Sequence, residues 1–575
     1  MRLGRRGVAQ FVVLSVLGVA GCSDKAASDQ PLGAAGVPGA LPGLPGAGAT
    51  AAGSGGLSAQ VVGTGIPGLT AGVLAAGSGG AGLIGAGGAA GALVPRVGAG
   101  SASVLQYHNH ANRDGLYVDP AFTRSRAALI EKDPAFMVPL KGPTYAQPLY
   151  FESPEGVDLI ITATEQNEVS AFNALSGAIV WQQLLAPPGE PGCGGNIRPL
   201  GVTGTPVIDG PSRTLFVAAM TAGTKQMIYA LSLDDGSTRA GWPVDVSTIR
   251  AGAVAFNPAY QHQRGALLLL NNVLYVPYGG NFQDCGEFHG WVVGVPLDNP
   301  AAPMAFATKG VGAGIWAPGG LASDGVSVIA ATGNTMEKPG AINTTPAIWG
   351  HGHAVLRLSP DLKDIAESQT VDFFASQDWK MQDKEGLDLG SSSPALFSLP
   401  GATPADLVLA MGKAGKAYLL DQKRLGGMGG ELQAVTISSG GIAGGLVQAT
   451  TVYPAPGGMF AVFRATQPAM GCKGTMGNYG ALKLTPGAPP TMTMAWCAEG
   501  NGTGSPIVTT PDGMTDSVVW YVSGGRLHGV NGETGAVLYR AMEPLGYVDK
   551  FQTPIVAKGR LYIAASDTLH AFTVK

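Results

Sequence analysis

The chain has 575 residues, of which 13% are charged, and its formal net charge at pH 7 is -4. Typical soluble domains carry about 25% charged residues, and no cluster of lysine and arginine offers the footprint that nucleic-acid phosphates require, so nucleic acid is excluded as a partner. The length allows several domains or one large repeat architecture with a full core.

The first residues form an export signal. A basic start precedes an apolar run over 8–20, and Val19-Ala20-Gly21 places small residues directly before Cys22. This arrangement resembles a bacterial lipoprotein signal, so we expect residues 1–21 to be a removed signal peptide and Cys22 to be lipidated. An ordinary secretory signal with a coincidental cysteine is the alternative.

The expected location is the cell envelope. Ser23 after the cysteine resembles the outer-membrane-directed form of the signal, which leaves the periplasmic face and the cell surface both open. Residues 22–103 are rich in Gly, Ala and Pro, and from Pro31 to Ser103 the only charge is Arg96, which predicts a disordered tether. A membrane span over 61–94 is the alternative, although recurrent glycine and Pro67 disfavour a helix there.

The region 104–575 is β-rich and repetitive. A small polar residue and a proline open strands at Gln147-Pro148, Thr205-Pro206, Ser393-Pro394, Ser505-Pro506 and Thr553-Pro554. Proline suits the first residue of a strand, where its missing N–H is tolerated. A second apolar strand then recurs in eight copies, at 159–162, 215–218, 274–276, 328–330, 407–409, 460–462, 518–521 and 561–563.

Third and fourth strands complete the repeat. Residues 171–181, Ala-Phe-Asn-Ala-Leu-Ser-Gly-Ala-Ile-Val-Trp, align with residues 529–539 around a tight turn. Evenly spaced repeats of four strands predict an all-β, eight-bladed β-propeller of four-stranded antiparallel blades. The last copy, 551–574, has only three strands, so we expect a segment near 135–141 to supply the fourth and close the ring by pairing the N- and C-terminal segments. A β-sandwich or two smaller barrels fit the spacing poorly.

The unit at Ala171–Trp181 resembles the tryptophan-docking motif of quinoprotein propellers, with Asn173 and Ser176 where Asp and Thr are usual. Segments 145–149, 290–294, 314–320 and 388–390 are similar to those of the pyrroloquinoline quinone (PQQ)-binding-like repeat family, across residues 104–575. That family includes PQQ-dependent alcohol dehydrogenases and also non-enzymatic lipoproteins, so the resemblance implies the architecture and leaves the chemistry open.

The resemblance implies what a quinone enzyme would need. Many members have a vicinal Cys-Cys disulfide, a cation held by carboxylate and amide oxygens, an arginine near the quinone and a catalytic aspartate; this chain has no adjacent cysteines. Polar residues before the inner strands should converge over the central channel as a small-ligand pocket, with an aromatic stacking surface. The candidates are Arg198, Arg264, Trp316, Asp388, Asn501 and Lys550. Caps and strand-end hydrogen bonds are the alternative role for each.

No sequence motif predicts a metal site. His108-Asn109-His110 and His351-Gly352-His353 each place two imidazoles two residues apart, but neither has a third ligand at suitable spacing, so hydrogen-bonded or surface histidines are expected. The glycine-rich runs 310–314 and 412–416 lead into β-like segments, which favours turns over phosphate loops.

Four cysteines remain after Cys22, which in an oxidising compartment indicates two disulfides among three possible connectivities. In a four-stranded blade, the loop between strands two and three and the crossover to the next blade emerge on the same face. We therefore expect all four on one rim, with Cys193 bonded to Cys285 and Cys472 to Cys497, and a redox site as the alternative.

These patterns predict a lipid-anchored, extracytoplasmic and monomeric propeller that serves as a binding or scaffolding module for a protein, peptide or glycan, with no cofactor. The alternative is a periplasmic PQQ-dependent alcohol or sugar dehydrogenase using PQQ and Ca²⁺. A hydrolase of surface polymers is a weaker third, because no paired-carboxylate motif is present.

Overall fold

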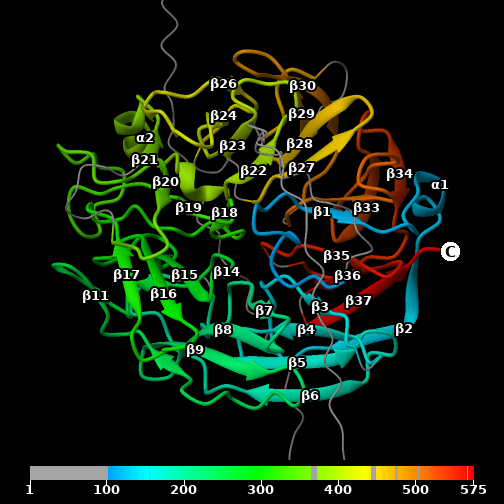
Figure 1. Ribbon diagram of the computed structural model, residues 1–575, viewed down its shortest axis with the longest axis horizontal. Coiled ribbons are helices and arrows are strands. Elements are labelled where there is room, and N and C mark those ends of the chain that lie inside the picture. The colour runs from blue at the N-terminus through cyan, green and yellow to red at the C-terminus, as the bar shows by residue number, and fades with distance from the viewer. Residues whose placement is uncertain are drawn as a thin grey trace, which may run out of the picture. The chain divides into compact units, whose positions relative to one another are not determined.

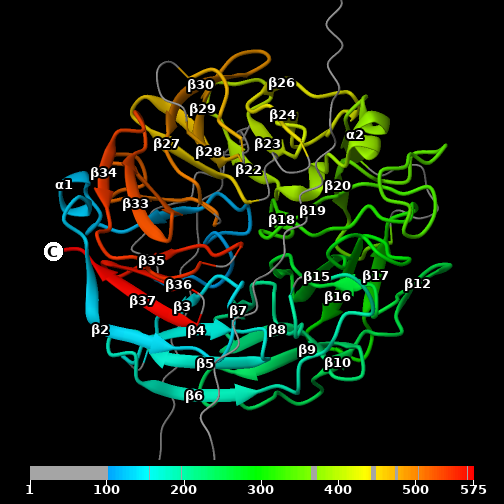
Figure 2. The same ribbon diagram turned by 180° about the vertical axis from the view of Figure 1, so that it is seen from behind.

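The computed structural model describes residues 102–154, 156–195, 197–363, 372–441, 448–465, 467–472, 477–502, 504–548, 550–565 and 567–575. These residues form eight radially arranged sheets that make a closed ring (Figure 1; Figure 2). The predicted eight-bladed propeller is therefore confirmed. The signal peptide, Cys22 and all of the tether up to Ser101 lie outside the described residues.

The blades are numbered in chain order, with strands running from the channel outward. Blade 1 has β3 (Leu149–Phe151), β4 (Leu159–Ala163), β5 (Glu168–Asn173) and β6 (Ile179–Leu184). Blade 2 has β7 (Val207–Asp209), β8 (Thr214–Thr221), β9 (Lys225–Ser232) and β10 (Val244–Asp245). Blade 3 has β13 (Gln261–His262) and β14 (Leu268–Leu270), both paired with β15 (Val273–Gly280), then β16 (Trp291–Pro296) and β17 (Met304–Ala307). Blade 4 has β18 (Ala322–Ser323), β19 (Val328–Ala331), β20 (Ala354–Leu358) and β21 (Asp372–Ala375), with β25 (Gly427–Met428) added outside.

The second half repeats the plan. Blade 5 has β22 (Ala395–Ser398), β23 (Asp406–Met411), β24 (Lys416–Asp421) and β26 (Gln433–Thr436). Blade 6 has β27 (Thr451–Ala455), β28 (Gly458–Arg464), β29 (Tyr479–Thr485) and β30 (Thr491–Ala498). Blade 7 has β31 (Ile507–Thr510), β32 (Val518–Ser523), β33 (Arg526–Asn531) and β34 (Val537–Arg540), with β1 (Leu116–Val118) inside β31. Blade 8 has β35 (Ile555–Ala557), β36 (Arg560–Ala565), β37 (Thr568–Thr573) and β2 (Glu131–Pro139).

The remaining described elements are short and lie outside the blades. They are the hairpin β11 (Arg250–Ala251) and β12 (Val254–Ala255), the helices α1 (Arg124–Ala127) and α2 (Trp379–Glu385), and the 3-10 turn Leu389–Ser391. No helix among the described residues has the length and apolar character needed to cross a membrane.

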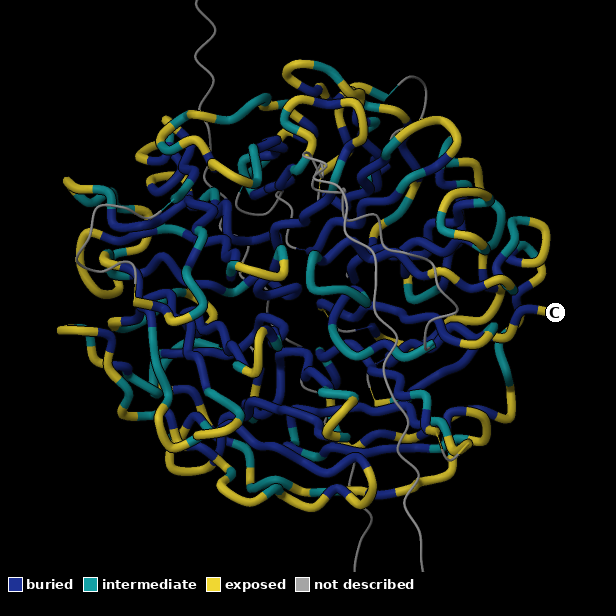
Figure 3. The backbone as a smooth tube through the Cα atoms, in the orientation of Figure 1, coloured by how far each residue is buried: buried dark blue, intermediate teal, exposed yellow. Residues whose placement is uncertain are grey.

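The strand predictions are confirmed in position. Each predicted proline directly precedes an inner strand, as Pro148 precedes β3 and Pro554 precedes β35. Each of the eight apolar segments is the second strand of its blade, and these strands are buried on both faces because they pack between neighbouring blades (Figure 3). The hydrophobic core therefore lies between sheets, while the connecting loops occupy the two rims.

Ring closure follows the predicted route. β2 pairs antiparallel with β37, with Val138 opposite Leu569 and Pro139 opposite Thr568, and a bulge separates this stretch from Lys132 opposite Phe572. The last blade thus takes its outermost strand from a segment that precedes blade 1, so that the outer edge of β37 is covered.

The residues 104–118, here called the hub segment, lie against the inner strands. Among other bonds, Val104 pairs with Tyr150 of blade 1, and the carbonyls of Leu105, Asn112, Asp114 and Gly115 accept hydrogen bonds from blades 2, 5, 6 and 7. Tyr107 Oη donates to Ser505 Oγ at 2.7 Å and lies 3.1 Å from Thr553 Oγ1 of blade 8. The segment therefore has a partner at most points around the channel, which its sequence did not predict.

Arg113 anchors the hub segment to two further blades. Its fully buried guanidinium donates to the carbonyls of Leu267 at 2.9 Å and Leu321 at 2.8 Å, which precede the inner strands β14 and β18. His108, one of the paired histidines, is also completely buried here and stacks on Tyr107, and burial lowers its pKa to about 3. It is a neutral internal group and not a surface histidine.

Two tryptophans dock neighbouring blades in the manner the sequence motif implied. Trp181 Nε1 donates to Leu233 O of blade 2 at 2.7 Å, and its ring lies over Gly236, where an added β-carbon would be 2.6 Å from Cε3. Trp496 repeats the contact with Gly532 O of blade 7 at 2.8 Å. The turn glycine is required because any side chain there would displace the indole.

Candidate functional site

Both predicted disulfides are present: Cys193 is bonded to Cys285, and Cys472 to Cys497. Cys285 and Cys472 lie in loops between second and third strands, Cys193 lies in the crossover from blade 1 to blade 2, and Cys497 lies near the end of β30 and not in the crossover itself. We call the face that carries these four cysteines the disulfide rim.

Five side chains meet where the disulfide rim opens toward the channel, and we call them the central cluster: Arg264, Asp284, Trp316, Asp388 and Lys413. The Arg264 guanidinium lies 4.8 Å from the centre of the Trp316 ring, and Lys413 Nζ lies 5.1 Å from it. Lys413 Nζ is also 2.5 Å from Asp388 Oδ2. The indole thus has two cations within reach of its π-system, an arrangement that stabilises each cation.

The fold places these residues through the starts of inner strands and through hairpin loops. Arg264 precedes β14, Trp316 precedes β18 and Asp388 precedes β22, whereas Asp284 and Lys413 lie in loops between second and third strands. At Gly333 an added β-carbon would lie 2.5 Å from Asp388 Oδ1 and 2.9 Å from Trp316 Nε1. Glycine is therefore needed there to let the carboxylate approach the indole edge.

The two carboxylates of the central cluster have pKa values that are shifted in opposite directions. Burial and the neighbouring Asp388 raise the pKa of Asp284 to about 6, against the opposing effect of Arg264. Burial alone would raise the pKa of Asp388 as well, but the Lys413 ammonium and its hydrogen bond hold that pKa below its ordinary value. Burial also lowers the pKa of Arg264 to about 10, so it remains a cation at neutral pH.

The loop that contains Asn334 and Thr335 holds Asp388 in place. Asp388 Oδ1 accepts from the Asn334 backbone N–H at 2.8 Å. The next residue, Thr335, donates its backbone N–H to the fully buried Asp383 at 2.8 Å, and Asp383 also lies 2.9 Å from His353 Nε2. The second predicted histidine pair therefore contributes a buried His–Asp contact that supports the loop under the cluster.

Three of the six predicted site residues meet, and three do not. Arg264, Trp316 and Asp388 belong to the central cluster, whereas Arg198 is half-exposed and bonds to Glu190 and to Gly194 O. Asn501 is exposed and its backbone N–H bonds to Ser523 Oγ. Lys550 Nζ lies 5.3 Å from the centre of the Phe282 ring. Phe282 is two residues before Asp284 in the sequence. Arg198 is diverted because Glu190 and Gly194 in its own loop satisfy its guanidinium.

Sequence reasoning missed Lys413 and Asp284. Lys413 belongs to the run 412–416, which is a turn as expected, with Gly415 at φ +69°. The signal that would have found both residues is the topology already used for the cysteines, because loops between second and third strands emerge on the same rim as the residues before inner strands.

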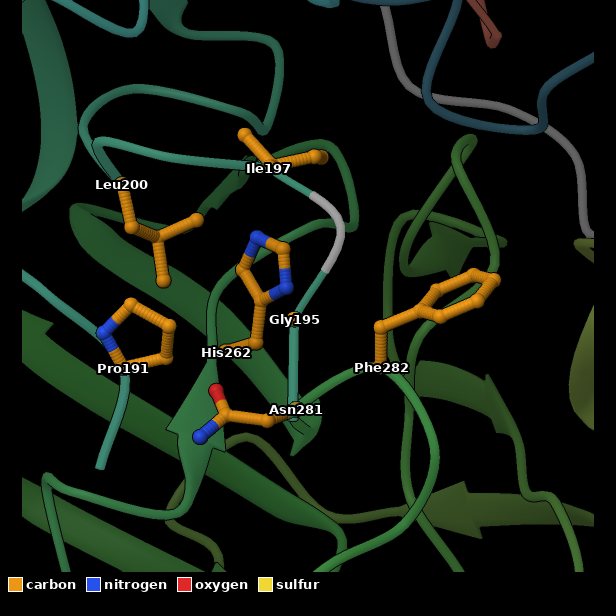
Figure 4. A pocket seen from close by; sticks show the side chains of 7 residues that line it. All are labelled: Pro191, Gly195, Ile197, Leu200, His262, Asn281 and Phe282. Atoms are coloured by element: carbon orange, nitrogen blue, oxygen red, sulfur yellow. The ribbon is translucent and has the colours of Figure 1, made fainter. Parts of the chain in front are cut away.

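Between the loops that carry Cys193 and Cys285 the structure leaves a cavity of about 10 Å³, lined by His262, Asn281, Phe282 and neighbouring apolar residues (Figure 4). That is room for about one water molecule. His262 faces Thr203 Oγ1 at 2.9 Å, so this buried imidazole already has a partner. The cavity is too small to hold an organic ligand.

Searches against family models and against curated proteins returned no match. Solved structures do resemble the chain. The quinohemoprotein alcohol dehydrogenase ADHIIG from Pseudomonas putida HK5 aligns with a TM-score of 0.56 at 11% identity, covering 82% of this chain and 80% of that one. The quinohemoprotein alcohol dehydrogenase from Comamonas testosteroni aligns with a TM-score of 0.55 at 12% identity, again covering 82% of this chain and 80% of that one. A europium-containing methanol dehydrogenase gives 0.55 at 13% identity, covering 81% and 90%.

This chain has the fold of a PQQ-like β-propeller. At 11–13% identity the likeness shows the fold alone, so chemistry has to be argued from the central cluster.

The central cluster fits a quinone with its cation poorly. Trp316 and Arg264 offer an aromatic surface and a donor, but Asp388 is already bound to Lys413, and Asp284 interacts with Arg264. Within the described residues no three His, Cys, Asp or Glu side chains converge as metal ligands. Carboxylates neutralised by lysine and arginine have little attraction left for Ca²⁺, which takes six to eight oxygen ligands. The arrangement is suited to holding a ligand by stacking and hydrogen bonds.

Proposed function

We propose that this PQQ-like propeller is a lipid-anchored, extracytoplasmic binding or scaffolding module, and that its disulfide rim holds a protein or peptide partner. The observation that carries the proposal is that both disulfides fix loops presenting exposed apolar side chains. Phe282 is 37% exposed and lies three residues before Cys285; Met470 is 47% exposed and lies two residues before Cys472. Loops held rigid in this way lose little entropy on binding.

Other groups on the same rim extend the surface. The crossover from blade 7 to blade 8 exposes Met542 and Tyr547, which are 92% and 70% accessible. Aromatic residues and methionine are enriched at protein interfaces, and methionine adapts to varied partners. Lys550 beside Phe282 adds an exposed cation that can receive a carboxylate of a peptide.

The test is site-specific photocrosslinking in intact cells. A photoreactive amino acid replaces Met470 on the disulfide rim or Met514 in the loop between β31 and β32, which belongs to the opposite rim; both methionines are 47% exposed, so they are matched. We expect discrete adducts from position 470 and none of the same size from position 514. Identical adduct patterns at both positions, or none at 470, would contradict the proposal.

The anchor is tested separately. The Cys22→Ser variant should leave the membrane fraction and lose labelling by a fatty-acid probe, because the predicted acceptor thiol is gone. Retention in the membrane after this substitution would argue against a lipid anchor without affecting the binding proposal.

The dehydrogenase alternative rests on Trp316 with Arg264 alongside, and on Asp284, whose pKa of about 6 would suit a proton acceptor. Purified protein dialysed against PQQ and Ca²⁺ distinguishes the two functions. The binding module predicts no quinone absorption band and no dye reduction with alcohols or sugars; both signals together would favour the enzyme.

A further inference from the structure

A pocket of about 290 Å³ lies between blade 1 and blade 8, on the rim opposite the disulfides. Its walls come from Gly156 and Asp158 before β4, the turn after β5 and the turn between β35 and β36. We call it the seam pocket, since it lies where the first and last blades meet. It shares no lining residue with the central cluster. The residues that matter below are Tyr150, Asp158, Asn173, Leu175, Lys558 and Tyr562.

The charges around the seam pocket are paired. Lys558 Nζ lies 2.8 Å from Asp158 Oδ2 and 2.8 Å from Glu152 Oε1. Arg560 bonds to Asp133 and donates to Leu175 O at 2.8 Å. Two cations therefore face three carboxylates, which leaves no positive surplus to hold a phosphate or another small anion.

Aromatic and hydrogen-bonding groups line the same space. The rings of Tyr150 and Tyr562 lie with centroids 6.0 Å apart at the base of the pocket. Their hydroxyls donate to Asp158 Oδ2 at 2.7 Å and to Ala174 O at 2.9 Å. The Tyr150 oxygen is thereby left able to accept, whereas the Tyr562 oxygen already has Arg560 as a donor. Asn173 Oδ1 caps the turn through Leu175 and Ser176, while its Nδ2 has no partner among the described residues and stays available as a donor.

We propose that the seam pocket binds one sugar unit, either a free monosaccharide or one residue of a glycan. Its volume is at the small end of ligand sites, which span roughly 300–1,000 Å³. Paired charges, the spare donor of Asn173, the spare acceptor of Tyr150 and the tyrosine walls match a neutral ring bearing several hydroxyls, each of which both donates and accepts. This site is independent of the partner proposed for the disulfide rim.

The experiment is saturation-transfer NMR on the full-length protein with the methyl glycosides of glucose, galactose, mannose and N-acetylglucosamine, and with short oligosaccharides of the sugar that binds. We expect saturable binding of at least one glycoside that is insensitive to added salt. Tighter binding of the oligosaccharide indicates a glycan source, and equal binding indicates the free sugar. Absence of saturable binding by all four glycosides overturns the proposal.

Two variants locate the site. Leu175 is 76% exposed at the pocket edge, so Leu175→Trp should obstruct entry and weaken binding at least about tenfold, or about 1.4 kcal/mol. Ile179, 59% exposed on β6 of the same blade and outside the pocket, provides the control Ile179→Trp, which should bind as the parent does. Binding that survives Leu175→Trp would overturn the assignment.

A competition experiment separates a neutral ligand from an anion. Inorganic phosphate in large excess should leave glycoside binding to the parent protein unchanged, because Lys558 and Arg560 are already paired with carboxylates. Displacement of the glycoside by phosphate would identify an anion site and refute the sugar assignment. Crosslinking at Met470 on the disulfide rim should be unaffected by Leu175→Trp and Ile179→Trp, which keeps the two proposals separable.

Discussion

Lys413 Nζ lies 2.5 Å from Asp388 Oδ2, and this ion pair closes the position where a bare carboxylate would face the channel mouth. Asp388 is only 5% exposed in total, so its charge depends on that partner. Removal of the Lys413 ammonium would therefore both leave the buried Asp388 carboxylate unpaired in blade 5 and take one cation away from the central cluster.

Lys413→Met should destabilise the fold by about 2–3 kcal/mol, below the full cost of orphaning a buried charge because Lys413 retains some solvent contact. Because the pKa of Asp388 is lowered in the folded state, its stabilisation is present above its unfolded pKa and is lost as the pH falls through the folded value. Urea unfolding at neutral and acidic pH should show the difference between parent and variant shrinking in acid.

The double variant Lys413→Met/Asp388→Asn controls for packing. It should recover part of the lost stability, since no unpaired carboxylate remains. A loss equal to or greater than that of Lys413→Met alone would show that the ion pair is not the cause.

Asp284→Asn tests the other carboxylate. The folded-state pKa of Asp284, about 6, lies above its unfolded value. The stability that the protonated carboxyl contributes is therefore fully present below pH 4 and is lost as the pH rises through 6. The parent should lose about 1–3 kcal/mol of stability over that interval relative to the variant. Parallel pH profiles of the melting temperature for the two proteins would be evidence against the raised pKa.

Trp181→Ala should cost about 3–5 kcal/mol, because it empties a buried site between blades 1 and 2 and leaves Leu233 O without its indole donor. Thermal unfolding measures the loss. Val537→Ala, at a position 68% exposed, is the control and should change stability by less than about 0.5 kcal/mol.

Arg113→Met removes the donor for the carbonyls of Leu267, Leu321 and Tyr107, all at 2.8–2.9 Å. Each buried carbonyl left unpaired costs about 1–3 kcal/mol, so we expect a loss of more than about 4 kcal/mol or no folded protein. Arg198→Met provides the comparison: that arginine is half-exposed, and its ion pair with Glu190 should be worth less than about 1 kcal/mol. Equal effects of the two substitutions would argue against the anchoring role of Arg113.

The Cys193–Cys285 bond spans 92 residues and the Cys472–Cys497 bond spans 25. If restriction of the unfolded chain dominates, replacing the first pair by serine should cost about 1 kcal/mol more than replacing the second, within a range of about 2–5 kcal/mol for each. Chemical denaturation of the two paired variants compares them. The reverse order would show that local packing outweighs the entropy of loop closure.

The fold could be predicted from the sequence because each blade repeats the same local pattern of residues. A proline such as Pro206 marks the start of an inner strand, and an apolar run such as 215–218 marks the strand buried on both faces. Radial repetition then fixes which loops share a rim, which is why both disulfides could be paired in advance.

The hub segment gave no such signal. Arg113 is polar, and its buried guanidinium binds the carbonyls of Leu267 and Leu321, which belong to different blades and are brought together only by ring closure. Likewise, Lys413 has the sequence context of an ordinary turn, and only the pairing of the strands of blade 5 places its loop beside Asp388, which precedes β22. Such contacts depend on tertiary geometry, which periodicity does not encode.

The pairing of β2 with β37 imposes an order on assembly. The nascent chain presents β2 early, yet that strand has no partner until β37 has been synthesised. Contacts of such long sequence separation form slowly, so the circle must be sealed last, and a polypeptide truncated near its C-terminus would leave both β2 and the edge of blade 8 open to association with other chains.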